Sequence, residues 1–190
     1  MLLFLASKSK RRIELLKSLG LDFIVIEPNV DESIIVADPE KTVITNAMKK
    51  VLSVLDKVPL GSVIMGVDTI VVVEGEILGK PKSLSQNIEM LRKLNGRWHL
   101  VYSGVFIVKK GENLTDSFIV KTAVKFGELS EKELLEYAST MEGMDKAGGY
   151  AAQGLGAVLI ERIEGDFYNI LGLPIFSLVR SLSKFGIEVL

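Results

Sequence analysis

The chain has 190 residues, 48% of them hydrophobic and 25% charged, which predicts a globular fold rather than intrinsic disorder. It has no cysteine and one histidine, which excludes disulfides, thiol catalysis, zinc–thiolate sites and histidine-rich metal sites. The formal net charge of −1 argues against a general nucleic-acid-binding protein. No apolar run reaches the roughly 18 residues of a membrane span, so we expect no membrane partner. Because cysteine is absent, a cytoplasmic enzyme is the default expectation.

Hydrophobic periodicity predicts strands and helices that alternate along the chain, without an internal repeat or an interdomain linker. Strands are expected at 2–6, 22–27, 62–67, 69–73, 77–78, 98–109, 114–126, 157–164 and 187–190, and helices at about 10–19, 39–57, 85–94, 131–139 and 174–185. Hairpin turns at 74–75 and 110–113 imply that part of the sheet is antiparallel. We therefore expect an α/β fold in a single domain over residues 1–190. Its mixed twisted sheet has helices on both faces and two lobes around a central cleft.

The first strand runs into a basic helix start, Leu5-Ala6-Ser7-Lys8-Ser9-Lys10-Arg11-Arg12. Ser9 is a suitable N-cap. Cations at a helix N-terminus oppose the helix dipole, so their presence makes sense if an anion lies among them. Hydroxyls, free backbone N–H groups and guanidinium groups together suit a phosphate. The alternative is a surface helix whose first turn happens to be basic.

Asp68 interrupts an apolar strand between Val63 and Val73. Burial of a carboxylate is costly unless it is paired or binds a metal, and aspartate is a poor strand former. One interpretation is a strand-end aspartate that bonds to backbone amides. The functional one is a general base or Mg²⁺ ligand that projects into a cleft. In that case Glu32, which precedes the next helix, is the second carboxylate.

Other polar segments have both a structural and a functional interpretation. Lys80 lies in Gly79-Lys80-Pro81 and would be a point charge for phosphate, although Lys-Pro usually marks an ordinary loop. Lys49 and Lys50 would by default belong to a solvated helix face. The glycine-rich segment 143–156 suits a substrate-covering loop, in which Gln153 would read the edge of a base. His99 is more simply a structural histidine than a catalytic one.

Taken together, these segments resemble the Maf family of nucleotide pyrophosphatases (septum-formation inhibitor Maf), almost from end to end. The resemblance is carried by LASKSKRRIELL at 5–16, VDE at 30–32, the lysine at 50, GVDTIVV at 66–72, GKP at 79–81, NGRWHLVYSGV at 95–105, DKAGGYAAQGLG at 145–156 and GDFYNILGLP at 165–174. It implies a fold similar to that of inosine triphosphate pyrophosphatases. It also implies cleavage of the α–β phosphoanhydride of nucleoside triphosphates with a divalent metal cation, Mg²⁺ or Mn²⁺, and a possible homodimer.

The resemblance also assigns roles to single residues. It makes Asp68 the proton acceptor and places Ser7, Arg11, Glu32, Lys50 and Lys80 in the polar catalytic cleft, with Glu32 and Asp68 as hard oxygen ligands for the metal. Arg12, Thr69 and Gln153 match positions that mark the branch acting on dTTP and UTP, as distinct from the branch that prefers 7-methyl-GTP. The stretch 46–51 departs from the family, which usually has leucine then alanine here, and alanine after the lysine. Lys49 therefore competes with Lys50 for the place facing the cleft.

The sequence-based hypothesis is a dTTP/UTP pyrophosphatase that could remove non-standard pyrimidine nucleotides. A second hypothesis is a housecleaning pyrophosphatase that prefers modified purines. A third is a nucleotide-binding regulator of cell division or septum formation with incidental catalysis. The retained set of Asp68, Glu32, Lys50 and Lys80 argues against a binding module without activity.

Overall fold

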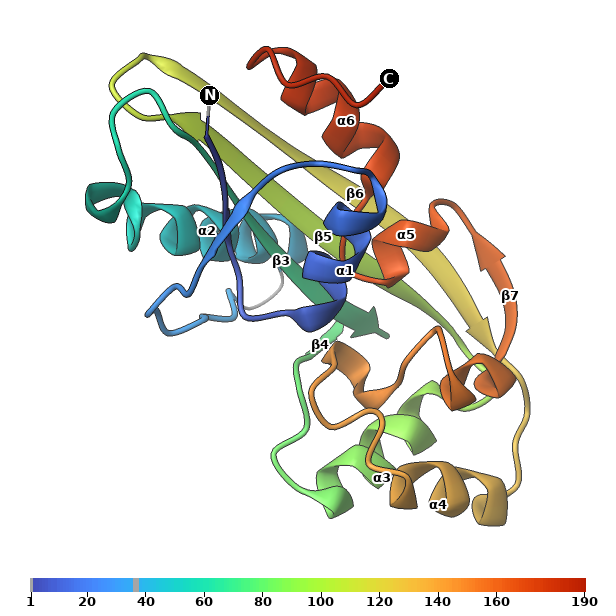
Figure 1. The fold of residues 1–190 in the computed structure, drawn as a ribbon. Helices are drawn as coiled ribbons and strands as arrows, with labels where there is room; N and C mark the ends of the chain where they lie inside the picture. The colour runs from blue at the N-terminus through green and yellow to red at the C-terminus, as the bar shows by residue number, and fades with distance from the viewer. Residues whose placement is uncertain (1, 36–37) are drawn as a thin grey trace.

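Figure 1 shows the fold as a computed structural model, which describes residues 2–35 and 38–190. Within these residues a seven-stranded sheet has the order β2-β1-β3-β5-β6-β7, with β4 paired to β3. The strands are β1 (Leu3–Ala6), β2 (Ile24–Ile26), β3 (Val63–Val73), β4 (Glu76–Leu78), β5 (Trp98–Lys109), β6 (Leu114–Phe126) and β7 (Ile160–Glu164). β1 is parallel to β2 and β3, whereas all other pairs are antiparallel, so the predicted mixed sheet is confirmed.

Six α-helices and three short 3₁₀ helices accompany the sheet in the described residues. The α-helices are α1 (Lys10–Ser18), α2 (Pro39–Leu52), α3 (Leu84–Leu94), α4 (Glu131–Ser139), α5 (Phe167–Ile170) and α6 (Ile175–Ser183). The 3₁₀ helices are η1 (Leu55–Lys57), η2 (Ala147–Gly149) and η3 (Leu155–Leu159). In the described parts of the chain, none of the helices has the length and apolar character needed to cross a membrane.

The helices cover both faces of the sheet, as predicted. Successive strand residues point to opposite faces, so neighbouring residues of one strand pack against different helices. Met65 of β3 packs with Leu16 of α1 and Leu178 of α6 on one face. Its neighbour Ile64 packs with Val51 of α2 on the other. At the end of the molecule where β4 pairs with β3, α3 and α4 lie side by side with η2 (Figure 1). This second lobe has its own apolar core, built around residues such as Leu91, Phe126 and Leu134.

A gap in one edge of the sheet positions the functional residues. β1 pairs with β3 only from Val63 to Gly66, and β4 pairs with β3 only from Val71 to Val73. β5 occupies the other edge of β3 over 63–72, so β1 and β4 share the remaining edge. Residues 67–70 of that edge therefore have no strand beside them. Their backbone groups and the side chain of Asp68 are left for other partners.

Helix α2 approaches this gap closely. Asp38 caps the helix by accepting from the backbone N–H of Lys41 at 2.9 Å, and Pro39 follows at the first helical position, as predicted. A Cβ atom at Gly66 would collide with the carbonyl oxygen of Ala47, so glycine at this position of β3 permits the close packing of α2. The helix ends at Leu52, earlier than predicted, and the single turn η1 follows it.

Two predictions for the C-terminal third need correction, and one helix there was not predicted. The strand predicted at 187–190 is wrong. The positive φ of Gly186 instead turns the chain back, so that the N–H of Ile187 bonds to the carbonyl of Leu182 in the manner of a Schellman motif. β7 begins at 160 because 155–159 form η3, whose first N–H groups are bound by Glu142. The one-turn helix α5 was not predicted, since four residues are too few to show a period.

Candidate active site

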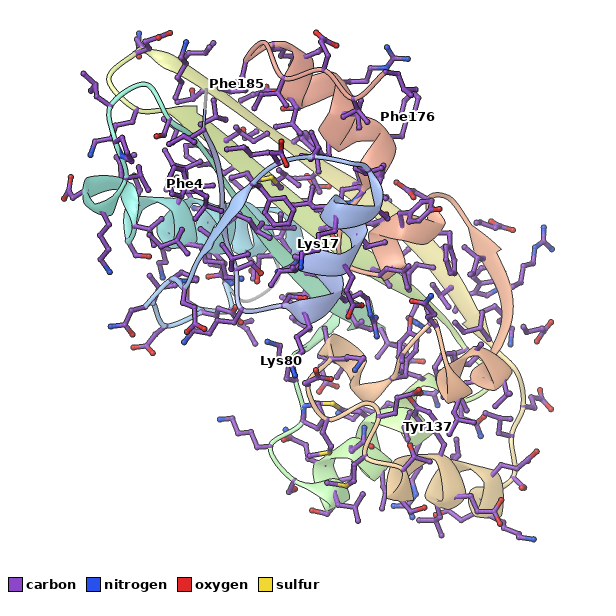
Figure 2. The ribbon with its side chains drawn as sticks, viewed as in Figure 1. Phe4, Lys17, Lys80, Tyr137, Phe176 and Phe185 are labelled. Atoms are coloured by element: carbon purple, nitrogen blue, oxygen red, sulfur yellow. The ribbon has the colours of Figure 1, made fainter. Side chains whose placement is uncertain are left out.

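A cavity of about 540 Å³ lies between α1, the open edge of β3 and the glycine-rich segment of the second lobe. Its size is in the usual range for a small-molecule site. Figure 2 shows Lys80 at the junction between α1 and the lobe that carries Tyr137. The predicted site residues that line the cavity are Ser7, Arg11, Arg12, Glu32, Lys50, Thr69 and Lys80. Residues from separate parts of the sequence therefore meet in one place.

Lys50 joins the two predicted carboxylates. Its ammonium group lies 2.6 Å from Asp68 Oδ1 and 2.7 Å from Glu32 Oε1, and it donates to the carbonyl oxygen of Val67 at 3.1 Å. That carbonyl belongs to the open edge of β3. Lys49 instead points to Ser33, whose Oγ accepts from Lys49 Nζ at 2.9 Å. The structure thus resolves the competition between the two lysines in favour of Lys50.

Asp68 lies behind this lysine, at the base of the cavity rather than in its lining. The residue is 4% exposed, and both carboxylate oxygens are engaged. Oδ1 accepts from Lys50, and Oδ2 accepts from the side-chain amide of Asn46 at 2.9 Å. Glu32, by contrast, has a half-exposed side chain and faces the cavity directly. The two carboxylates therefore differ in access to solvent while they share one cation.

The charges around the cavity perturb the pKa values of its members. Burial raises the pKa of Glu32, but Lys50, by charge and hydrogen bond, together with Lys80 and Arg12, more than offsets this and holds the pKa below its usual value. Burial lowers the pKa of the Arg12 guanidinium, although Asp68 and Glu32 act in the opposite direction. The positive charges of Lys50, Lys80 and Arg12 thus favour the anionic form of Glu32.

Arg12 and Thr69 form one wall of the cavity. Arg12 Nε donates to the carbonyl oxygen of Gly172 at 2.7 Å, and its terminal NH2 group donates to Thr69 Oγ1 at 2.9 Å. Thr69 Oγ1 also lies 2.8 Å from the hydroxyl of the buried Ser103 on β5. Because Asp68 and Thr69 are adjacent on a strand, they point to opposite faces, and the open edge of β3 lets both faces contribute to one site.

The start of α1 supplies a second polar wall, as its sequence predicted. Ser9 is the N-cap and accepts from the backbone N–H of Arg12, while the buried Ser7 accepts from the backbone N–H of Ser9 at 3.1 Å. Lys8, Lys10 and Arg11 line the cavity beside these hydroxyls. This combination of basic side chains with a helix N-terminus suits a phosphate group.

The glycine-rich segment is packed against the sheet and is partly buried. Gly148 has a φ of 72°, and a Cβ atom there would press on Val71 of β3. Its N–H donates to the carbonyl of Gly79 at 3.0 Å, which ties the segment to the turn that carries Lys80. Lys146 and Tyr150 line the cavity. Gln153 is exposed and does not line it, so the structure does not bring Gln153 together with the other predicted residues.

The fit of a divalent metal follows from the donor set. In residues 2–35 and 38–190, no group of three or more histidine or acidic side chains could hold a metal ion by itself. Glu32 provides one hard oxygen donor that faces the cavity, and Asp68 provides a second behind it, where Lys50 and Asn46 now bind its oxygens. Mg²⁺ is commonly bound by one or two carboxylates, with water and substrate phosphate oxygens as its other ligands. The residues present therefore fit a metal that arrives with a phosphate substrate.

Sequence reasoning missed two groups of residues. Asp145 and Lys146 line the cavity from the second lobe, and their signals were the glycine-rich pattern and their place in the motif at 145–156. Asn46 bonds to Asp68, but it lies in a helix that reads as an ordinary amphipathic helix. A single sequence does not show that Asn46, one helical turn before Lys50, bonds to the same carboxylate as Lys50.

His99 is a structural residue of the second lobe, as the sequence predicted. It is 2% exposed, its Nε2 lies 2.8 Å from the hydroxyl of Tyr150, and its ring makes edge contacts with Phe126 and Tyr150. Burial lowers the pKa of His99 from 6.5 to about 4. The neutral imidazole therefore belongs to the apolar packing behind the cavity wall.

This buried histidine predicts a pH-dependent stability. Between its unfolded pKa of 6.5 and its folded pKa of about 4, the unfolded chain binds a proton that the folded chain excludes. The free energy of unfolding should fall by roughly 2 kcal/mol between about pH 7 and pH 5. Urea unfolding at both pH values checks this. His99→Gln should be less stable at pH 7 but lose less between the two values. Equal losses in both proteins would contradict the assignment.

Comparison with known proteins gives the family. Residues 2–185 match the family model "Maf-like protein". A dTTP/UTP pyrophosphatase of Staphylothermus marinus is 48% identical over 191 aligned residues, covering 100% of this chain and 92% of the relative. A dTTP/UTP pyrophosphatase of Dictyoglomus turgidum is 44% identical, covering 99% and 98%, and one of a Thermoanaerobacter species is 45% identical, covering 97% and 96%. The chain therefore belongs to the Maf-like protein family.

Proposed function

We propose that this protein is a nucleoside triphosphate pyrophosphatase that hydrolyses the α–β phosphoanhydride of dTTP and UTP, with the monophosphate and pyrophosphate as products. The observation that carries the proposal is the carboxylate–lysine–carboxylate cluster of Asp68, Lys50 and Glu32 beneath a cavity lined with cations. The relatives named dTTP/UTP pyrophosphatase, which align over nearly their whole length, support the same activity.

In the proposed mechanism these residues share the steps of hydrolysis. Arg11, Lys80 and the N-terminus of α1 bind the phosphate chain and offset its charge. Asp68 accepts a proton from the water that attacks the α-phosphorus, as the α–β oxygen bond breaks and pyrophosphate leaves with the bridging oxygen. Lys50 holds the acceptor carboxylate in place and offsets the negative charge that grows near it.

We also propose that Glu32 and Asp68 hold the divalent metal, Mg²⁺ or Mn²⁺, which neutralises phosphate charge when it is bound. The half-exposed Glu32 can reach a metal in the cavity, and its lowered pKa keeps it in the anionic form that a metal requires. A homodimer stays a prediction of the family resemblance, and a cytoplasmic location stays a prediction from the composition of the chain.

Product analysis tests the activity. The purified protein is incubated with Mg²⁺ and each of dTTP, UTP, CTP, GTP and a modified purine triphosphate, and the products are separated by chromatography. The proposal expects dTMP and UMP with pyrophosphate. Faster turnover of the modified purine would favour the housecleaning alternative, and binding without turnover would favour the division-related regulator.

The base preference gives a separate prediction. Thr69, with Arg12 bonded to it, places polar groups at the cavity wall where they can meet the imide edge of thymine or uracil. A wrong base would leave these groups unpaired, which costs that base up to several kcal/mol of transition-state binding and so gives selectivity. Thr69→Val should therefore reduce the ratio of kcat/KM for UTP over CTP and GTP by roughly tenfold or more. Equal kcat/KM values on dTTP, UTP, CTP and GTP in the unaltered protein would refute the pyrimidine preference.

Gln153→Ala tests the last predicted specificity residue. We expect it to lower discrimination between UTP and GTP more than it lowers the unfolding temperature. Since Gln153 lies outside the cavity, such a loss would report that the segment around Gly154 moves toward the bound nucleotide. Unchanged discrimination would remove Gln153 from the site and leave Thr69 and Arg12 in it.

A further inference from the structure

Asn46 is a buried amide at the boundary between α2, the open edge of β3 and the loop that carries Glu32. The residue is 2% exposed. Its Nδ2 donates to Asp68 Oδ2 at 2.9 Å and to the carbonyl oxygen of Ser33 at 3.1 Å. Its Oδ1 accepts from the backbone N–H of Ser33 at 3.0 Å. Both amide hydrogens and one oxygen lone pair are thus in use, which is what a buried amide requires.

The first consequence concerns the orientation of Asp68. Asn46 and Lys50 are four residues apart on α2, so they lie on the same face, one turn from each other. One binds Oδ2 and the other binds Oδ1 of the same carboxylate. A carboxylate held by Lys50 alone would be free to rotate about the Cβ–Cγ bond. Two donors on different oxygens fix the plane of the group.

The second consequence concerns Glu32. Residues 27–35 contain no helix or strand, so contacts must hold this loop in place. The amide of Asn46 makes a paired N–H and C=O contact with the backbone of Ser33, in the manner of a single β-bridge. Glu32 is the preceding residue and reaches Lys50 from there. The same side chain therefore anchors the loop of one carboxylate and orients the other.

We infer that Asn46 is a positioning residue of the active site, which sets the relative placement of Asp68 and Glu32 without touching the substrate. This inference rests on the proposed pyrophosphatase function and adds a residue to its machinery. Asn46 does not line the cavity, so its loss should act on turnover rather than on nucleotide binding. Removal of groups that orient a reacting residue commonly costs about 10- to 100-fold.

Asn46→Leu is the test, with Thr42→Val as its matched control. Leucine has the same number of side-chain heavy atoms as asparagine, branched at the same carbon, but makes none of its hydrogen bonds. Thr42 lies one turn earlier on the same helix, is equally buried, and bonds to the backbone of Ile35 in the same loop. In the described residues Thr42 makes no hydrogen bond to Asp68. Thr42→Val therefore removes a buried loop contact without disturbing the orientation of the carboxylate.

With dTTP and Mg²⁺, Asn46→Leu is expected to lower kcat about 10- to 100-fold with KM within about threefold of the unaltered protein. Thr42→Val should change kcat by less than about threefold at a similar loss of unfolding temperature. Asn46→Asp keeps the acceptor for the Ser33 N–H but sets a carboxylate against Asp68, so it should be slower than Asn46→Leu. Equal kcat values for Asn46→Leu and Thr42→Val, or a faster Asn46→Asp, would overturn the inference.

Hydrogen–deuterium exchange separates this inference from the proposed function. The Ser33 amide should exchange faster in Asn46→Leu, and the Ile35 amide should exchange faster in Thr42→Val. If the unaltered protein releases no pyrophosphate, the proposed function fails, whatever the exchange shows. If it does release pyrophosphate and Asn46→Leu exposes Ser33 without a loss of kcat, only the positioning role of Asn46 is wrong.

Discussion

Asp68→Asn is expected to lower turnover of dTTP and UTP by about 10²- to 10⁴-fold while nucleotide binding is retained, because loss of a general base has this magnitude. The variant keeps an oxygen for Lys50, but its new NH₂ group would face the Nδ2 donor of Asn46. Two donors in contact leave a buried group unsatisfied, which costs about 1–3 kcal/mol of stability. Steady-state kinetics below the unfolding temperature and a nucleotide-binding titration measure the two effects separately.

Asp116→Asn provides the matched control. Asp116 on β6 is likewise bonded to a lysine and a second polar group, Lys184 and Ser181 of the α6 region, and it does not line the cavity. The same chemical change there should lower stability and leave kcat within about twofold, since no residue of the site is touched. Near-normal activity of Asp68→Asn, or an equal loss in both variants, would remove Asp68 from the role of proton acceptor.

The sequence predicted most of the fold because its signals are local. The cap at Asp38 with Pro39, the capping box at Ser130 and the hairpin at 110–113 each bring their own hydrogen bonds, and the structure shows all of them. The failures arise where distant contacts decide the conformation. At 155–159, the Glu142 carboxylate binds the first backbone N–H groups of η3, where a strand was predicted. After Gly186, the N–H of Ile187 bonds to the carbonyl of Leu182 in α6.

Seven of the predicted site residues line the cavity, but their geometry was not predictable. The basic start of α1 and the aspartate within an apolar strand are visible as chemical anomalies in the sequence. Only the strand pairing shows that β1 stops at Ala6 while β3 continues to Val73. The difference in strand length leaves part of the edge of β3 open, and Lys50 bonds to the carbonyl of Val67 there. The structure also shows what one residue of the stretch 46–51, which departs from the family, does: Asn46 bonds to Asp68.

The neighbouring lysines of α2 give the second large effect. Lys50→Met should lower kcat/KM at least about 100-fold, because Asp68 loses the donor to Oδ1 and the cavity loses a cation. It should also destabilise the fold by about 3 kcal/mol, since the buried Asp68 keeps its charge without its partner. Kinetics with dTTP and urea unfolding measure both losses.

Lys49→Met is the control on the adjacent residue. Lys49 bonds to the Ser33 hydroxyl, while the Ser33 backbone stays held by Asn46, so activity should stay within about twofold and stability within about 1 kcal/mol. The double variant Lys50→Met/Asp68→Asn removes both charges of the buried pair. It should recover part of the stability lost in Lys50→Met without recovering activity, because the two residues are energetically coupled. Restored activity in the double variant, or a larger loss in Lys49→Met than in Lys50→Met, would mean that the cluster around Lys50 is structural and that the chemistry lies elsewhere in the cavity.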